Sequence, residues 1–142
     1  MYRLSEQSQA RLADVHPNLV SCVHRAMSYQ IMDFMVAEGA RSLQRQKKLV
    51  EDGKSRTMLS KHLIQSDGYA HAVDLYPYPV DMAKVHKGDP REIFRFGVLS
   101  GMMMRAAQEL KIEIINGADW DGDGQTLDHT FFDAPHFQLL RL

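Results

Sequence analysis

The sequence predicts an α+β fold: one compact domain with a small, mostly antiparallel sheet packed with helices. Helical and strand-like hydrophobic patterns mix along the chain without the regular strand–helix–strand rhythm of a parallel sheet. The 142 residues show no shift in composition that would mark a boundary, so we expect one domain over residues 1–142. A hydrophobic fraction of 44% and a charged fraction of 25% are typical of a globular chain and argue against disorder.

Capping residues predict three helices in the first part of the chain. Ser5 can cap a short helix that ends near Val15, and the fixed φ of Pro17 suits the first turn of a second. In that second segment, apolar residues at helical spacing predict a buried stripe. The stripe consists of Leu19, Val23, Ala26, Met27 and Ile31. Ser42 can cap a third helix that ends near Asp52.

Alternating or short apolar runs predict four strands, and a longer helix separates the second from the third. The strands cover residues 33–37, 71–76, 111–116 and 136–142. Asp89 and Pro90 begin the long helix, which reaches about Leu110. Its predicted inner face consists of Phe94, Val98, Met102 and Ala106.

Charge and cysteine content exclude several classes of function. With 17 basic and 18 acidic residues the net charge is −1, so no overall field attracts a polyanion and we expect no nucleic-acid partner. Cys22 is the only cysteine, which excludes an intrachain disulfide and leaves His and carboxylates as metal ligands. Residues 1–6 lack the apolar run of a secretory signal, and no stretch approaches a membrane span. We therefore expect a protein made in a cytoplasm, without membrane insertion. We also expect a monomer.

Two histidines and an aspartate have the chemistry of a catalytic zinc site. Such an ion takes three protein ligands and keeps one position for water, whose pKa it lowers to about 7. His62, Asp74 and His136 can supply the three ligands. On a regular strand Asp74 shares a face with Ala72 and opposes His71, so we interpret His71 as a flanking residue. If the segment is irregular, that argument lapses.

Asp133 precedes His136 by three residues, and the intervening Pro135 favours a turn over a continuous strand. In a turn the carboxylate and the imidazole can converge on one point. Asp133 could then take a proton from the attacking water and pass it to the leaving amine. The alternative is that Asp133 only orients His136. The spacing leaves both roles open.

The acidic residues Asp119, Asp121 and Asp123, followed by Gly124, match the opening of an EF-hand calcium loop. Position twelve of such a loop is usually a bidentate Glu, whereas here it is Thr130. The segment is therefore a candidate calcium site, and a solvated acidic turn is the alternative. Bound calcium would order the chain just before the C-terminal site residues and so regulate activity.

Three motifs and several further segments carry a resemblance to a known family. The motifs are Ser60-x-His62, Gly68-x-Ala70-His71-Ala72-Val73-Asp74-Leu75 and Asp133-x-x-His136-Phe137. The further segments are residues 4–6, 15–20, 38–46, 55–57 and 119–124. Together they cover nearly the whole chain and resemble the L-alanyl-D-glutamate endopeptidases of bacteriophages, within the VanY-like D-alanyl-D-alanine peptidase superfamily.

The resemblance implies a zinc metallopeptidase with a Hedgehog/DD-peptidase-like fold. It implies a phage endolysin that cuts the L-Ala–D-Glu bond of peptidoglycan stem peptides, acting in the periplasm after release through a membrane pore. The family's zinc ligands match His62, Asp74 and His136, and its catalytic carboxylate matches Asp133. Arg41 matches a family arginine near the substrate; a surface salt bridge is the alternative interpretation.

One departure from the family pattern concerns the first two ligands. Asp74 follows His62 by twelve residues, more than in the commonest form of the motif, as if residues 63–67 were an insertion. This leaves His71 as a substitute for His62. Two other functions also fit the motifs: a D-Ala-D-Ala carboxypeptidase or dipeptidase with the same site, and a noncatalytic, zinc-stabilised wall-binding module.

Overall fold

A four-stranded sheet with strand order β1-β2-β4-β3 forms the centre of the computed structural model, which describes residues 1–55, 57–119 and 133–140. All three neighbouring pairs are antiparallel, which confirms the expected α+β class. The helices are α1 (Glu6–Arg11), α2 (Pro17–Ser28), α3 (Leu43–Glu51), α4 (Met82–His86) and α5 (Pro90–Leu110). The strands are β1 (Phe34–Glu38), β2 (Ala72–Pro77), β3 (Ile114–Gly117) and β4 (Asp133–Leu139).

The predicted helix starts are confirmed by their caps. The Ser5 side chain accepts a hydrogen bond from the Ser8 amide, and the Ser42 side chain accepts one from Arg45. Pro17 opens α2, and Pro90 opens α5 behind the capping side chain of Asp89. α4 was not expected from the sequence, because its five residues are too short for a visible helical period.

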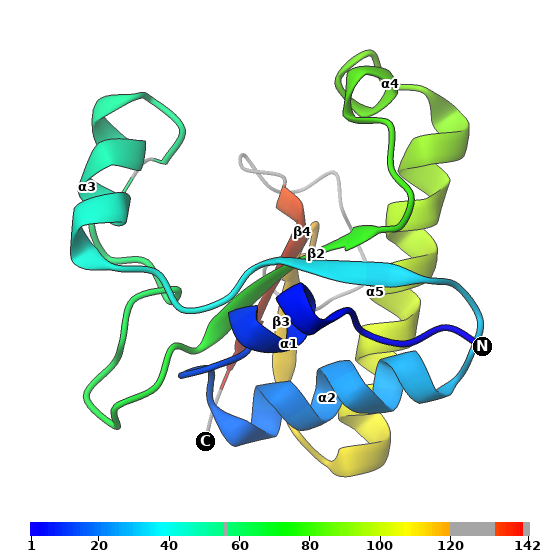
Figure 1. The fold of residues 1–142 in the computed structure, drawn as a ribbon, viewed down its shortest axis with the longest axis horizontal. Coiled ribbons are helices and arrows are strands. Elements are labelled where there is room, and N and C mark those ends of the chain that lie inside the picture. Colours follow the sequence, from blue (N-terminus) through cyan, green and yellow to red (C-terminus); the bar gives the residue numbers. More distant parts are fainter. Residues whose placement is uncertain (56, 120–132, 141–142) are drawn as a thin grey trace.

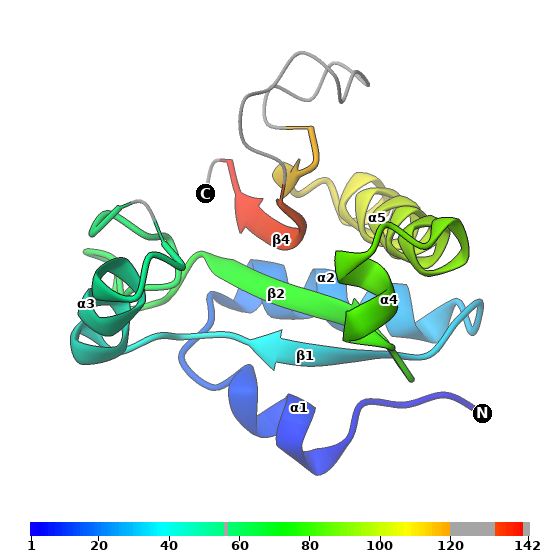
Figure 2. The same ribbon diagram turned by 90° about the horizontal axis from the view of Figure 1, so that it is seen from above.

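The two faces of the sheet have different surroundings. α2 and α5 pack against each other and cover one face, whereas α3 and α4 stand apart from each other on the other side (Figures 1 and 2). Side chains alternate along β2, so Val73 and Leu75 belong to the hydrophobic core while Asp74 faces away from it. This alternation leaves one face of the sheet available for polar chemistry.

The predicted inner faces of the two long helices are partly wrong. Phe94 is 70% exposed, and Ile31 is 60% exposed because α2 has already ended at Ser28. Residues four apart are displaced by about 40° around a helix. Along the series Met102, Val98 and Phe94 the side chains therefore turn progressively away from the core, and Phe94 faces solvent. The buried side chains of α5 are Phe96, Leu99, Met102, Met103, Ala106 and Ala107.

The turn predicted at Pro135 is also wrong, because β4 runs through it from Asp133 to Leu139. The ladder to β3 is nevertheless irregular there: Asn116 pairs with Phe137, and the next residue, Gly117, pairs with Asp133. The side-chain amide nitrogen of Asn116 donates hydrogen bonds to the backbone carbonyls of Ala134 and His136, at 2.8 and 2.9 Å. A proline is tolerated in such a bulge because its missing N–H breaks no regular ladder bond.

Gly117 is required at this bulge. A Cβ on Gly117 would overlap the carbonyl oxygen of Asp133, so β3 can approach the start of β4 only without a side chain. We predict that Gly117→Ala lowers the free energy of unfolding by about 1–3 kcal/mol through this overlap. Urea denaturation measures the change.

Gly101→Ala is the matched control, since a Cβ at this position in α5 meets no atom within 4 Å. There the better helix propensity of Ala should raise stability by roughly 0.5–1 kcal/mol. Equal stability of the Gly117→Ala variant and the unsubstituted protein would contradict the prediction.

Candidate active site and metal centre

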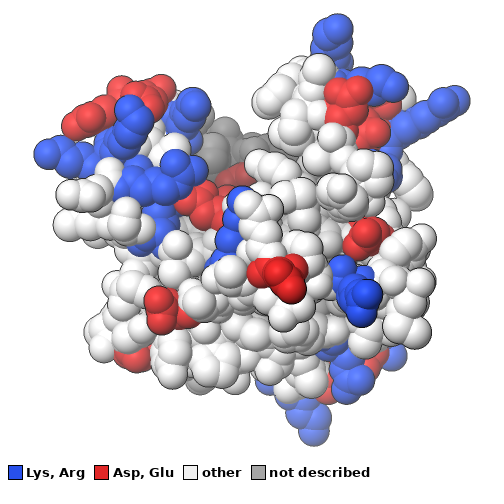
Figure 3. Space-filling view, viewed as in Figure 1, with Lys and Arg blue, Asp and Glu red and all other residues white. Residues whose placement is uncertain are grey.

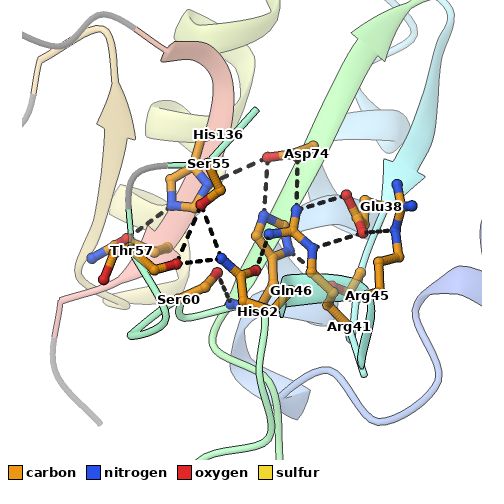
Figure 4. Close-up of polar contacts among 12 residues, drawn as sticks. Glu38, Arg41, Arg45, Gln46, Ser55, Thr57, Ser60, His62, Asp74 and His136 are labelled. Carbon is orange, nitrogen blue, oxygen red and sulfur yellow. Dashed lines mark hydrogen bonds and ion pairs between the residues drawn. The ribbon is translucent and has the colours of Figure 1, made fainter. Parts of the chain in front are cut away.

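Three side chains from separate parts of the chain converge on the open face of the sheet (Figure 4). Asp74 and His136 are direct partners in the β2–β4 ladder, so their side chains stand next to each other. His62 reaches the same point from the segment between α3 and β2. Asp74 Oδ1 lies 3.2 Å from His62 Nε2 and 3.3 Å from His136 Nδ1. One ligand atom from each of the three lies within 4.8 Å of the others, which is close enough to share a metal ion.

The outer nitrogen of each imidazole is held by an oxygen acceptor. His62 Nδ1 lies 2.8 Å from the carbonyl oxygen of Gly39, and His136 Nε2 lies 2.8 Å from Gln138 Oε1. Because these oxygens only accept, each outer nitrogen donates its N–H. The inner nitrogen of each ring faces Asp74, and once it has lost its proton it presents the lone pair that a metal ligand needs.

The segment after β1 holds His62 from two sides. Gly39 accepts from the ring, and the Arg41 amide donates to the His62 carbonyl at 2.7 Å. A Cβ at Gly39 would overlap the carbonyl oxygen of Arg11, so only glycine lets this segment pass the end of α1. His62 is consequently 2% exposed and fixed in direction.

The electrostatics of the cluster favour an ionised Asp74. Burial raises the pKa of Asp74, but hydrogen bonds from His136 and His62 outweigh it and hold that pKa well below its usual range. Burial lowers the pKa of His136, and the hydrogen bond to Asp74 more than offsets this, so that pKa is raised. An anionic oxygen between two imidazoles is an environment that attracts a cation.

A second carboxylate and two arginines lie next to the cluster of His62, Asp74 and His136. Glu38 is the β1 partner of Asp74 and accepts two hydrogen bonds from Arg41, at 2.7 and 2.8 Å, and one from Arg45 at 2.8 Å. Burial raises the pKa of Glu38, but the hydrogen bonds and charges of these two arginines lower it by more, so the net shift of the pKa is downward.

Arg41 is more tightly held than a surface salt bridge would be. Its side chain is 9% exposed, another of its N–H groups donates to Gln46, and the guanidinium lies 3.9 Å from Asp74 Oδ2. This position lets Arg41 balance the charge of two neighbouring carboxylates.

His71 lies away from the cluster, as the strand argument expected. Its Nε2 is 2.8 Å from Asp67 Oδ2, and its ring packs edge-on against that of His16. The His71 amide also donates to the Lys61 carbonyl at 2.8 Å, which closes the long segment between His62 and Asp74 at its base. The additional residues between His62 and Asp74 therefore form a loop that does not move either side chain away from the site.

Asp133 lines the same groove as the cluster and is partly buried. Burial raises its pKa, and the charge of Asp74 raises it further; His136, His62 and Arg41 offset part of this. The outer nitrogen of His136 donates a hydrogen bond to Gln138 Oε1. A carboxyl group with a raised pKa next to a cation site is suited to accept and return a proton.

The groove around these residues has a volume of about 810 Å³ and lies next to α3, where Figure 3 shows the surface hollowed. Arg41 and the polar segment after α3 form one wall, including Lys54 and Lys61. The candidate calcium ligands Asp121 and Asp123 lie outside the described residues.

Sequence reasoning missed two of the contributors. Gln138 shares a strand face with His136, so the alternation of β4 could have indicated it. Glu38 gave no local signal, because its place beside Asp74 depends on the register of β1 against β2.

Comparison with known proteins finds relatives of this chain by sequence and by fold. The crystal structure of the Serratia marcescens L-Ala D-Glu endopeptidase ChiX is similar, with a TM-score of 0.70, 29% sequence identity, and coverage of 96% of this chain and 90% of that one. The L-alanyl-D-glutamate peptidase of Escherichia phage T5 is 26% identical over 145 residues, covering 98% of both chains. The model of the family described as phage L-alanyl-D-glutamate peptidase matches residues 1–140, and the chain therefore belongs to that family.

Proposed function

We propose that this protein is a zinc-dependent phage endolysin that hydrolyses the L-Ala–D-Glu bond of peptidoglycan stem peptides. The observation that carries the proposal is the cluster of His62, Asp74 and His136 at the floor of an open groove, with Asp133 in the same groove. The names of the phage T5 and Serratia relatives specify the same bond. Family membership supports the expected class of enzyme, an L-alanyl-D-glutamate peptidase.

The three cluster residues fit zinc in number and chemistry. Two imidazole nitrogens and one carboxylate oxygen form a ligand set found in catalytic zinc sites, and three ligands leave a further position open. A bound zinc ion polarises a carbonyl and lowers the pKa of a coordinated water. The Gly39 carbonyl and Gln138 hold the two imidazoles in the required tautomer.

We assign the proton transfers to Asp133. Its carboxylate would accept a proton from the attacking water and donate it to the departing nitrogen of D-glutamate. The raised pKa of Asp133 supports this assignment, because a carboxyl whose pKa is nearer to neutral holds the proton longer between the two steps. Arg41 remains our candidate for substrate binding, since it lines the groove beside Asp74.

In the proposed lytic role, the enzyme is made in the host cytoplasm and reaches the cell wall through a membrane pore. Within residues 1–55, 57–119 and 133–140, no helix has the length and apolarity needed to cross a bilayer.

Removing one cluster ligand should release the metal. We predict that His62→Ala and His136→Ala each lose stoichiometric zinc, whereas His71→Ala keeps it, because His71 is bonded to Asp67 and lies outside the cluster. Metal analysis of the purified variants gives the content. Loss of zinc from His71→Ala with retention in His62→Ala would reverse the ligand assignment.

Removing the proton carrier should separate metal binding from catalysis. We predict that Asp133→Asn keeps its zinc but loses about 10²–10⁴-fold in kcat, because an amide cannot shuttle a proton. Mass spectrometry of digested peptidoglycan follows the reaction and also identifies the bond that is cut. Release of D-alanine by the unsubstituted protein would favour a carboxypeptidase instead, and full activity of Asp133→Asn would remove Asp133 from the mechanism.

Gln138, which accepts the hydrogen bond from the outer nitrogen of His136, should affect zinc affinity. We predict that Gln138→Leu weakens zinc affinity by about 10–100-fold, because the outer N–H of His136 loses this acceptor. Competition with a chelator of known affinity measures the change. Gln108→Leu, in which the replaced amide bonds Arg105 on α5, is the matched control and should bind zinc normally. Equal affinities for both variants would rule out this role for Gln138.

A further inference from the structure

Asp133 lies between two hollows of opposite character. One is the groove described above. The other has a volume of about 570 Å³ and lies among α4, the first half of α5 and the start of β4. Asp133 lines both hollows, and in Figure 1 the start of β4 stands between the α3 side and the α4–α5 side of the molecule. A peptide that is cut beside Asp133 can therefore extend into a different environment in each direction.

The hollow on the α3 side is basic at its rim. Lys54 and Lys61 line it and are exposed, and neither takes part in an ion pair within the described part of the chain. Figure 3 shows basic side chains gathered over the α3 side of the hollow. The acidic lining residues Glu38 and Asp74 are already paired with Arg41 or the histidines. The unpaired positive charge at this rim is therefore available to a ligand.

The hollow on the α4–α5 side is largely apolar. Its apolar side chains are Met82, Val85, Ile93, Phe96, Ala134 and Pro135. Among the described residues that line it there is no lysine or arginine, and its charged members are Asp119 and Asp133. A carboxylate would be repelled from this hollow, whereas an uncharged apolar group would gain by leaving water.

We propose that the apolar hollow is the subsite for the L-alanine side of the scissile bond, including the acyl group on the alanine nitrogen. The basic rim of Lys54 and Lys61 then receives the D-glutamate side. This assignment rests on the function proposed above. Glutamate has two carboxyl groups and the stem peptide continues through one of them, so the other remains a carboxylate within a few bonds of the cleaved amide. Charge complementarity thus sets the direction of the peptide.

The proposed direction agrees with the role given to Asp133. The nitrogen that departs belongs to D-glutamate, so it leaves towards the basic rim while the acyl-alanine product remains in the apolar hollow. Asp133, which lines both hollows, adjoins the bond between the two halves. One carboxylate can therefore meet the attacking water and the departing nitrogen without moving between subsites.

The two reaction products test the two halves separately. N-acetyl-L-alanine and γ-D-glutamyl-L-lysine are each used as inhibitors of the zinc-loaded enzyme, with N-acetyl-L-alanyl-γ-D-glutamyl-L-lysine as substrate. Lys61→Ala should weaken inhibition by the glutamyl product about two- to fivefold, the range for an exposed charge pair, and leave inhibition by acetyl-alanine unchanged. Ile93→Asn should weaken inhibition by N-acetyl-L-alanine and leave inhibition by the glutamyl product unchanged.

Each variant has a close control. Lys47→Ala removes an exposed lysine of α3 that does not line the groove. Ile93 lines the apolar hollow and is 41% exposed. Its neighbour Phe94 does not line that hollow, so Phe94→Asn is the control for Ile93→Asn. Both controls should match the unsubstituted enzyme in kcat/KM and in both inhibition constants. Equal zinc content and circular dichroism verify that all four variants fold.

A second substrate isolates the carboxylate itself. When the free carboxylate of D-glutamate is replaced by a carboxamide, the unsubstituted enzyme should lose the same two- to fivefold in kcat/KM, and Lys61→Ala should no longer distinguish the two peptides. Exchanged effects of Lys61→Ala and Ile93→Asn would reverse the direction, and unchanged inhibition constants would remove the subsites. Hydrolysis with unaltered selectivity overturns this inference alone, whereas absence of any L-Ala–D-Glu cleavage overturns the proposed function.

Discussion

The pairing of Asp74 with His136 across β2 and β4 is the constraint on which the site depends. Direct partners in an antiparallel ladder point to the same face, so the register of one strand pair brings a carboxylate and an imidazole together. A slip of one residue would turn Asp74 into the core and bring Val73 or Leu75 to the open face. The hydrophobic packing of α2 and α5 on the other face opposes such a slip. The core therefore secures the geometry of the chemistry.

Around this pair, backbone geometry contributes as much as side chains do. Gly39 lets the chain pass α1 and supplies the carbonyl that orients His62, while Gly117 lets β3 approach Asp133 closely. Asn116 holds two carbonyls of the bulged part of β4. These contacts place the site on rigid elements, which is the condition for a metal centre whose ligands must converge within a few tenths of an ångström.

The charges around the site form layers with distinct roles. Asp74 lies between two imidazoles, and Arg41 links Asp74 to Glu38. Asp133 stands at the border between a basic and an apolar hollow, where burial and the charge of Asp74 raise its pKa. A substrate with a carboxylate on one side of its cleaved bond and an apolar group on the other is complementary to this asymmetry. In the proposed mechanism, both the orientation of the substrate and the proton transfer depend on Asp133.

Local chemistry was sufficient to predict the α+β class, the caps at Ser5, Ser42 and Asp89, and the family, because caps, hydrophobic periods and motifs are properties of neighbouring residues. It also selected the three residues that the structure brings together, and strand alternation separated His71 from them. The fold alone decided the bulge at Pro135, the exposure of Phe94 and the contacts of Glu38 and Gln138. Those features depend on strand register and on how α5 is rotated over the sheet, and both arise from contacts between segments distant in the chain.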